Sequence, residues 1–256
     1  MPPTVAVADL HGHLKQLQRL LKRLDDELGD YLLVTLGDYV DNGPEIPGLL
    51  DFLIKLKAQR GDRFAPIIGN HDLACLRALG WDDQPPNEDW WDRWSSRYWD
   101  PGLGTPAQYG ATSAQSFTAE FPKGHRDFLQ ALPWFHDDGT HFFVHAGLDA
   151  QPLQPQRDAL HARILPREPF YLPRQIGEKA LSVVSYAEWG RVVISGHTKG
   201  SNIARLAPTH PHLPHFMTEQ RITLSAEVDV TGVLYVVVLP ERRFVFADLG
   251  GSKTRG

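Results

Sequence analysis

The sequence predicts an α/β protein built on a mainly parallel sheet. In the first seventy residues, a short apolar run is followed by a loop and a helical pattern, and this order occurs twice before a third apolar run. Alternating strands and helices are typical of βαβ units, whose strands run parallel. In the last third of the chain, apolar runs separated by short polar turns predict antiparallel strands.

The first part of the chain contains the clearest predicted elements. Residues 4–9, TVAVAD, form the first strand, and six leucines over 14–28 recur at the spacing of one helix face. The second strand is YLLVTL over 31–36, and a helix is expected over 45–60. FAPIIG over 64–69 is the third strand.

Residues 80–122 interrupt this pattern. They contain five of the seven tryptophans together with acidic residues, Pro and Gly, and Trp90, Trp94 and Tyr98 recur at helical spacing. We interpret this segment as an aromatic-rich insertion that packs over the core of a single domain, residues 1–256.

The α/β pattern resumes after the insertion. The expected elements are a helix over 124–131, a strand over 141–147, a helix over 177–189, a strand over 191–197, and antiparallel strands within 222–230, 232–240 and 242–249.

Composition is that of an ordinary globular protein. The formal net charge of −5 argues against a protein that coats nucleic acid. The single cysteine, Cys75, excludes an internal disulfide and fits a reducing compartment. The N-terminal stretch has no basic leader, and no run approaches the ~18 apolar residues of a membrane span. We therefore expect a cytoplasmic protein with no membrane or nucleic-acid partner; the oligomeric state is left open.

Five strand-to-loop junctions end in side chains of the kind that bind metal ions. Because the carboxyl ends of parallel strands meet at one edge of a sheet, we expect these side chains to converge. Oxygen and nitrogen ligands suit Mn, Fe or Zn. Asp38, in the middle of the series, is placed to bridge two cations. The six candidate ligands are Asp9, His11, Asp38, Asn70, His145 and His197.

Two neighbouring residues fit general acid chemistry. His71 follows Asn70 directly, and Asp41 lies three residues after Asp38. A carboxylate commonly holds a catalytic histidine in its useful tautomer, so we expect Asp41 to orient His71. His71 would then protonate the leaving oxygen of a phosphoester, while two cations about 3.5–4 Å apart activate a shared water.

These motifs resemble those of the phosphoprotein phosphatase family of calcineurin-like metallophosphoesterases. The family pattern is GDxHG, GDxVDRG, GNHE, a His before Gly and a late GH. This sequence has ADLHG, GDYVDNG, GNHD, HAG and GHT in the same order, from residue 5 to about 200. Further stretches are similar to small bacterial serine/threonine-phosphatase-like members. The resemblance implies two mixed sheets packed as a sandwich between helical layers, in the order αββα.

The resemblance also implies roles for single residues. It makes His71 the acid and Asp41 its orienting partner. It assigns the ligands to two metals, with Asp9, His11 and Asp38 at the first and Asp38, Asn70, His145 and His197 at the second.

One departure from the family pattern affects phosphate binding. Asn42 occupies the position of a family arginine that holds phosphate oxygens, and it supplies neither charge nor a guanidinium fork. A charge-assisted hydrogen bond is worth about 1.5–3 kcal/mol, so we expect phosphate affinity to fall about tenfold or more while the metals remain. Arg167 resembles a second phosphate-clamping arginine. With Asn42 and Asn70 it makes up the expected phosphate contacts.

The resemblance implies a two-metal phosphatase that uses a metal-bridging hydroxide, with Mn²⁺ favoured and Fe or Zn as other options. Its substrate would be a protein phosphorylated on serine, threonine or tyrosine, or a small phosphoester. A diadenosine-tetraphosphatase or another nucleotide hydrolase of the same superfamily is an alternative, because the metal core is shared and insertions select the substrate. A catalytically weak phosphate-binding module, weakened at Asn42, is an alternative of a different class.

Overall fold

Two five-stranded mixed sheets form the centre of the computed structural model, which describes residues 2–82, 85–97, 103–166, 172–210 and 214–247. The first sheet has the order β10-β9-β1-β2-β3, and the second has the order β4-β5-β6-β8-β7. The strands are β1 (Thr4–Val7), β2 (Leu32–Thr35), β3 (Phe64–Pro66), β4 (Phe135–Asp137), β5 (His141–Val144), β6 (Val192–Ser195), β7 (Phe216–Met217), β8 (Arg221–Thr223), β9 (Leu234–Leu239) and β10 (Arg243–Ala247).

Each sheet has a parallel centre. Strands β1, β2 and β3 pair in parallel, and β9 and β10 add antiparallel strands on the other side of β1. In the second sheet β5, β6 and β8 are parallel, while β4 and β7 are antiparallel edges. The parallel strands β1, β2 and β3 therefore have the βαβ order that the sequence predicted.

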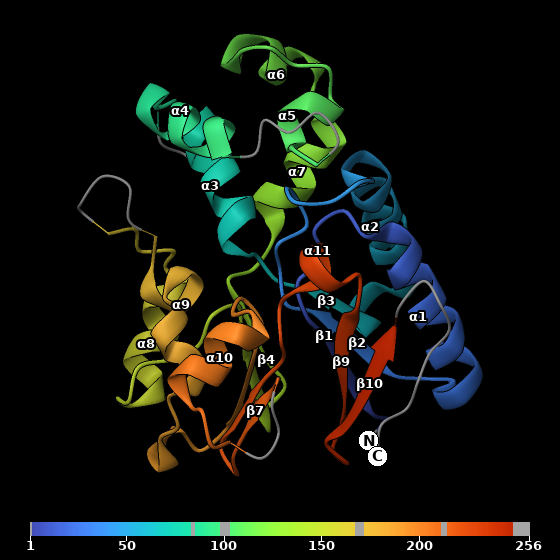
Figure 1. Cartoon of the computed structure of the whole chain (residues 1–256), viewed down its shortest axis with the longest axis vertical. Coiled ribbons are helices and arrows are strands. Elements are labelled where there is room, and N and C mark those ends of the chain that lie inside the picture. Colours follow the sequence, from blue (N-terminus) through green and yellow to red (C-terminus); the bar gives the residue numbers. More distant parts are fainter. Residues whose placement is uncertain (1, 83–84, 98–102, 167–171, 211–213, 248–256) are drawn as a thin grey trace.

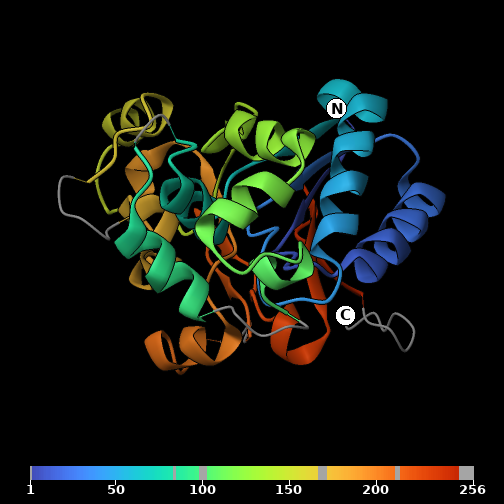
Figure 2. The same ribbon diagram turned by 90° about the horizontal axis from the view of Figure 1, so that it is seen from above.

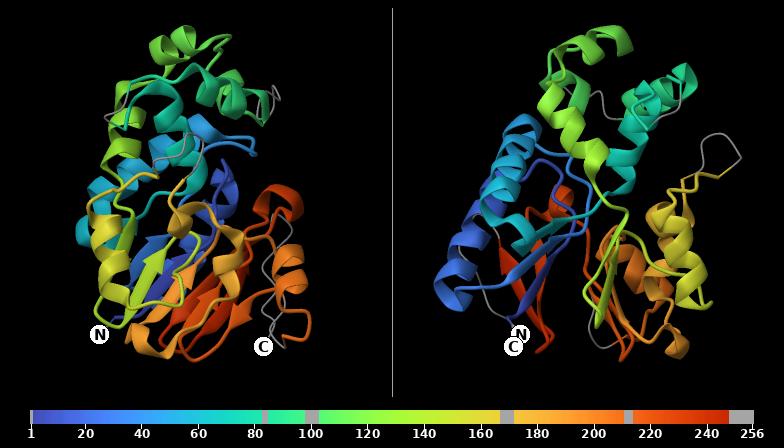
Figure 3. Two further views of the ribbon diagram at one scale, coloured as in Figure 1. Left: turned by 90° about the vertical axis from the view of Figure 1, so that its left-hand side faces the viewer. Right: turned by 180° about the vertical axis from the view of Figure 1, so that it is seen from behind.

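Helices cover both outer faces of the sandwich (Figure 1). Helices α1 (Leu14–Leu28) and α2 (Ile46–Arg60) lie against the first sheet, and α8 (Leu153–His161), α9 (Arg174–Gly177) and α10 (Gly200–Leu206) lie beside the second (Figure 3). The layers thus follow the order helices, sheet, sheet, helices. This confirms the predicted fold class.

The alternation of side chains along β1 shows how the layers are held together. Val5 and Val7 belong to a cluster that contains the leucines of α1, whereas Ala6 and Ala8 belong to a second cluster between the two sheets. Strands buried on both faces need apolar residues throughout, which explains the continuous apolar runs of the sequence.

The insertion stands above one edge of the sandwich, as the view from above shows (Figure 2). Its helices are α4 (Glu88–Arg97), α5 (Thr105–Gln108) and α6 (Ala114–Glu120), between α3 (Asn70–Leu79) and α7 (Lys123–Ala131). The rings of Trp91 and Trp94 pack on Phe117, with centroids 5.9 and 5.6 Å from it. Trp90 and Trp94, which were predicted at helical spacing, lie in α4 and belong to the buried core, whereas Tyr98 lies outside the described residues.

Two predicted elements differ from the structure. The expected helix over 177–189 is instead the end of α9 followed by two short 3-10 helices, η2 (Lys179–Val183) and η3 (Ala187–Trp189). Val184 between them is extended, which suits a β-branched residue. The stretch 222–230 does not pair with the two strands that follow it: β8 lies in the second sheet, parallel to β6 and antiparallel to β7, and the chain then forms α11 (Val228–Thr231).

Two remaining findings complete the fold. A short 3-10 helix, η1 (Gly61–Arg63), links α2 to β3. Within the described residues, every helix is too short or too polar to cross a bilayer.

Candidate metal centre

The predicted ligands lie just after strands that end at one edge of the sandwich. Asp9 follows β1, Asp38 follows β2, and Asn70 begins α3 shortly after β3. His145 follows β5 directly, and His197 comes two residues after β6. Both sheets therefore contribute to one site, and the structure brings these loops within hydrogen-bonding distance of one another.

Four potential metal-ligand atoms lie close together, and one of them is Oδ2 of Asp38. His145 Nε2 lies 3.3 Å from Asp38 Oδ2 and 3.0 Å from Asn70 Oδ1. His197 Nδ1 lies 2.7 Å from Asn70 Oδ1 and 3.2 Å from His145 Nε2. His145 Nδ1 donates to the Leu36 carbonyl at 2.6 Å, so the Nε2 lone pair of the neutral ring faces the other three atoms.

This donor set fits a divalent cation. Lone pairs of a carboxylate, an amide oxygen and two ring nitrogens repel one another unless a positive charge lies between them. If the Asn70 amide is turned over, its nitrogen donates to His145 Nε2, His197 Nδ1 and Asp38 Oδ2, and these hydrogen bonds take the place of the contacts to a cation. Mixed oxygen and imidazole ligands suit Mn, Fe or Zn, and which of these metals binds stays a prediction.

A second group of side chains lies near the same oxygen of Asp38. His11 Nε2 is 3.8 Å and His71 Nε2 is 3.9 Å from Asp38 Oδ2. His11 Nδ1 donates to the carbonyls of Val40 and Asp41, at 3.0 and 3.1 Å, so its Nε2 lone pair is directed away from them. Asp38 is thus common to two groups of potential ligands, which is the arrangement expected of a dinuclear site.

Asp9 lies beside these groups without belonging to either. Its Oδ1 accepts a hydrogen bond of 2.9 Å from the backbone N–H of His197. Gly196 permits this approach, because a Cβ there would lie 2.3 Å from the same oxygen. The role of Asp9 as a ligand stays a prediction, whereas His71, predicted as the acid, also lies within reach of a cation.

Burial and neighbouring charges shift pKa values at the site. Burial opposes ionisation of Asp38, yet the His145 and His71 rings hold its pKa well below the usual range. Burial also opposes charge on both rings, but Asp38 outweighs it and raises the pKa of His145 to about 10 and that of His71 to about 9. Burial, with the charge on His145, lowers the pKa of His197 to about 3. Burial raises the pKa of Asp9 to about 6.

The pair predicted to act as acid and orienting carboxylate is in contact. His71 Nδ1 donates to Asp41 Oδ2 at 2.9 Å, which leaves Nε2 on the side of Asp38. The buried Asp41 carboxylate accepts two further hydrogen bonds, from Trp94 Nε1 at 2.8 Å and from Thr105 Oγ1 at 2.5 Å. Sequence reasoning missed both of these donors, because no motif links them to Asp41.

Asp72 organises the loops that present the ligands, and sequence reasoning gave it no role. Its Oδ2 accepts the backbone N–H groups of Asp38 and Gly69, and its Oδ1 accepts that of Tyr39, each at 2.9 Å. Burial, with the charge of Asp38 nearby, raises the pKa of Asp72 to about 7. Its place three residues after Gly69, at the third position of α3, is a capping signal that could have revealed it.

The backbone at the site is unusual. Seven residues other than glycine have a positive φ in the described part of the chain, and five of them lie in the ligand loops. Such conformations are costly and cluster at functional sites. The five are His11 (φ 39°), Asp38 (53°), Asp41 (63°), Asn42 (60°) and His197 (65°).

The predicted phosphate contacts remain predictions. Asn42 is half-buried directly after Asp41, and its left-handed backbone is one that asparagine tolerates well. Arg167 lies outside the described residues.

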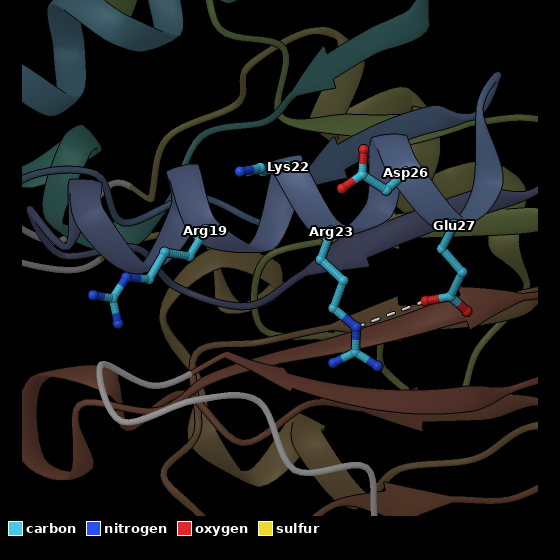
Figure 4. A pocket seen from close by; sticks show the side chains of 5 residues that line it. All are labelled: Arg19, Lys22, Arg23, Asp26 and Glu27. Carbon is cyan, nitrogen blue, oxygen red and sulfur yellow. Dashed lines mark ion pairs between the residues drawn. The ribbon is translucent and has the colours of Figure 1, made fainter.

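A separate hollow lies on the outer surface of α1 (Figure 4). Arg19, Lys22, Arg23, Asp26 and Glu27 line it, and Arg23 pairs with Glu27 at 3.7 Å. None of these residues belongs to the loops that form the candidate metal centre.

Curated relatives of the chain are symmetrical bis(5'-nucleosyl)-tetraphosphatases. The enzyme of Pseudomonas fluorescens is 39% identical over 75 residues, which are 29% of this chain and 25% of the relative. That of Dechloromonas aromatica is 28% identical over 165 residues, which are 64% of this chain and 49% of the relative. The alignments therefore span a quarter to a half of these relatives.

Solved structures share the fold across nearly the whole chain. A candidate diadenosine tetraphosphatase aligns with a TM-score of 0.56 at 19% identity, covering 98% of this chain and 95% of that one. A cold-active protein tyrosine phosphatase aligns with a TM-score of 0.58 at 15% identity, covering 99% and 80%. The family model of the calcineurin-like phosphoesterases matches residues 2–200, which include every ligand loop described above. This chain therefore belongs to the calcineurin-like phosphoesterase family.

Proposed function

We propose that the protein is a two-metal phosphoesterase that hydrolyses dinucleoside polyphosphates, cleaving bis(5'-nucleosyl) tetraphosphates symmetrically into two nucleoside diphosphates. The observation that carries the hydrolase proposal is the Asp38 carboxylate, which is shared by two groups of histidines, His11 with His71 and His145 with His197. The substrate class comes from the curated relatives, which are named for this activity. They favour the nucleotide hydrolase over the protein phosphatase that the motifs first implied.

The proposed chemistry divides between bound cations and the side chains of the chain. When bound, two divalent cations supply an activated water and neutralise charge on the phosphoryl oxygens. Asp38, Asn70, His145 and His197 would hold one of them.

The proton for the leaving oxygen would come from His71. Its Nδ1–H is held by Asp41, so the ring cannot turn and its Nε2 remains directed to the side of Asp38. A protonated Nε2 there can donate to an oxygen that leaves phosphorus. Asn42 has a neutral amide at a place where a charged side chain would bind the phosphate oxygens more tightly. Arg167 stays the expected second residue that binds phosphate.

A protein phosphatase remains the second candidate. The loop GDYVDNG keeps both aspartates of the phosphoprotein phosphatase pattern. The hydrogen bond between Asp41 and His71 is the contact that this resemblance implied. Fold likeness to a protein tyrosine phosphatase at 15% identity does not distinguish the two candidates.

A substrate panel tests the proposal. Protein stripped of metal and reloaded with Mn²⁺ is given diadenosine tetraphosphate, a phosphoserine peptide, a phosphotyrosine peptide and an aryl phosphate, and products are separated by anion exchange. We expect ADP as the sole nucleotide product, with a kcat/KM well above that for the peptides. Asp38→Ala should abolish turnover, and His71→Ala should reduce kcat by about 100-fold or more, as expected for loss of a general acid. His161→Ala, which changes an exposed histidine at the end of α8, should leave kcat unchanged.

Three results would contradict the proposal. A higher kcat/KM for either phosphopeptide would assign the protein to the protein phosphatases. Production of ATP and AMP would show asymmetrical cleavage. Binding of two cations and of phosphate without hydrolysis of any substrate would identify a phosphate-binding module.

A further inference from the structure

We propose that the aromatic-rich insertion is part of the reaction machinery: Trp94 and Thr105 are positioning residues that fix the Asp41 carboxylate and, through it, the His71 ring. This inference rests on the proposed function, in which His71 donates the proton. It gives the insertion a second role besides packing over the core, which is to hold the orientation of the His71 ring.

The hydrogen bonds around Asp41 come from three separate elements. Oδ2 accepts from His71 Nδ1 in α3, at 2.9 Å, and from Trp94 Nε1 in α4, at 2.8 Å. Oδ1 accepts from Thr105 Oγ1 in α5, at 2.5 Å, and the same hydroxyl accepts the Asp41 backbone N–H at 2.9 Å. Donors on both oxygens and on the backbone leave the carboxylate one orientation.

The insertion also holds the loop that follows Asp41. Gln108 Nε2 donates to the Gly43 carbonyl at 2.6 Å, and Gln108 Oε1 accepts the Ile46 backbone N–H at 2.9 Å. Thr105 and Gln108 are the first and last residues of α5, so one short helix fastens both the start and the end of this loop.

Packing alone does not require these polar atoms. The Trp94 ring contacts Trp91 and Phe117, which a phenylalanine at position 94 would also contact. Trp94 is 3% exposed and Thr105 is fully buried, and burying a polar group is favourable only when it is hydrogen-bonded. Both groups direct their bonds at one carboxylate, which indicates a positioning role.

Positioning of an acid has a specific kinetic consequence. An ester with a poor leaving group depends on protonation of the leaving oxygen, whereas an ester with a good leaving group does not. A loosened Asp41 should therefore slow phenyl phosphate much more than p-nitrophenyl phosphate. A merely structural defect would slow both equally.

The experiment compares Trp94→Phe and Thr105→Val in the Mn²⁺-loaded protein. We expect each to reduce kcat for phenyl phosphate about tenfold (~1.4 kcal/mol) and kcat for p-nitrophenyl phosphate less than about threefold, with KM and metal content unchanged. Thr105→Ser retains the hydroxyl and should behave as the wild type. Trp91→Phe is the matched control, since it removes an indole from the same helix that has no described hydrogen bond to Asp41.

Two further measurements keep the test decisive. Adding Thr105→Val to His71→Ala should cause no further loss of kcat, because the hydroxyl acts only through the ring. In ¹⁵N-edited NMR of the full chain, exchange of the His71 Nδ1 proton with water should accelerate in Trp94→Phe and not in Trp91→Phe.

Equal losses on both esters, full additivity with His71→Ala, or unchanged proton exchange in Trp94→Phe would overturn the inference while the proposed function stands. If the wild type hydrolyses neither ester nor any nucleotide, the proposed function fails. The NMR comparison then still decides whether the insertion orders the ring.

Discussion

Replacing Gly69 with alanine should disrupt the metal centre through a single added carbon. Gly69 has extended backbone, with φ at −108°, so an alanine is not strained there by its own conformation. Its Cβ would lie 2.1 Å from Asp38 Oδ1 and 2.2 Å from the Asp38 backbone nitrogen. Because Cβ contacts below 3.0 Å essentially never occur, Asp38 and residue 69 must separate by about 0.9 Å, the difference between 3.0 and 2.1 Å.

A displacement of this size is large for a metal ligand. Ligand distances must agree with ideal values within about 0.2 Å, and a misplacement of about 1 Å can cost on the order of 100-fold in rate. Overpacking of this kind also costs about 1–3 kcal/mol of stability. We therefore expect fewer than two bound Mn²⁺ per chain, a loss of about 100-fold in kcat/KM and a lower Tm.

The measurements are metal content by atomic emission, Mn²⁺ titration by calorimetry, and thermal unfolding. Gly124→Ala is the matched control: the same carbon is added to helix α7, where nothing lies within 4 Å of it. It should leave metal content and rate unchanged. A Gly69→Ala protein that binds two Mn²⁺ with wild-type affinity would show that Asp38 is not held where the structure places it.

Three other predictions concern pH, phosphate and metal. Burial opposes ionisation of Asp138, but hydrogen bonds from His141 outweigh it and lower its pKa to about 2. Because solvent screens this partly exposed carboxylate, Asp138→Asn should reduce the free energy of unfolding by only about 1 kcal/mol near pH 7. Since the folded pKa lies below the unfolded value, this difference should shrink below about pH 4 and vanish near pH 2, and urea unfolding at both extremes checks it. Asn42→Arg should lower KM for aryl phosphates about tenfold at constant kcat, and a fall in activity on one substrate class would instead identify Asn42 as a selectivity residue. Chelation should lower the free energy of unfolding by about 2.7 kcal/mol relative to protein at 100 times the Kd for Mn²⁺, which differential scanning calorimetry with and without added Mn²⁺ measures.

Local pattern was sufficient to predict the ligand loops. Asp9, Asp38 and His145 each lie within three residues of the end of a mainly apolar strand, and parallel pairing brings such ends together. Residues up to 188 positions apart, such as Asp9 and His197, meet for this reason.

The misses arose where long-range contacts decide. The residues of Arg221–Thr223 look the same in sequence whether this strand pairs with β6 and β7 or with β9, and only the tertiary structure selects β6 and β7. Trp94 and Thr105 lie 53 and 64 residues after Asp41, in a segment with no regular spacing relative to it. Their indole and hydroxyl look the same in sequence whether they face solvent, core or carboxylate.

The left-handed residues of the ligand loops offer a way to distinguish working relatives from inactive ones. A side chain in that conformation costs roughly 1–2 kcal/mol compared with glycine, so His11, Asp38 and His197 each lower the stability of the folded protein. In a homologue that no longer hydrolyses phosphoesters, substitution of these residues by glycine removes the strain and raises the melting temperature. Homologues that have taken this step should melt higher and have no turnover.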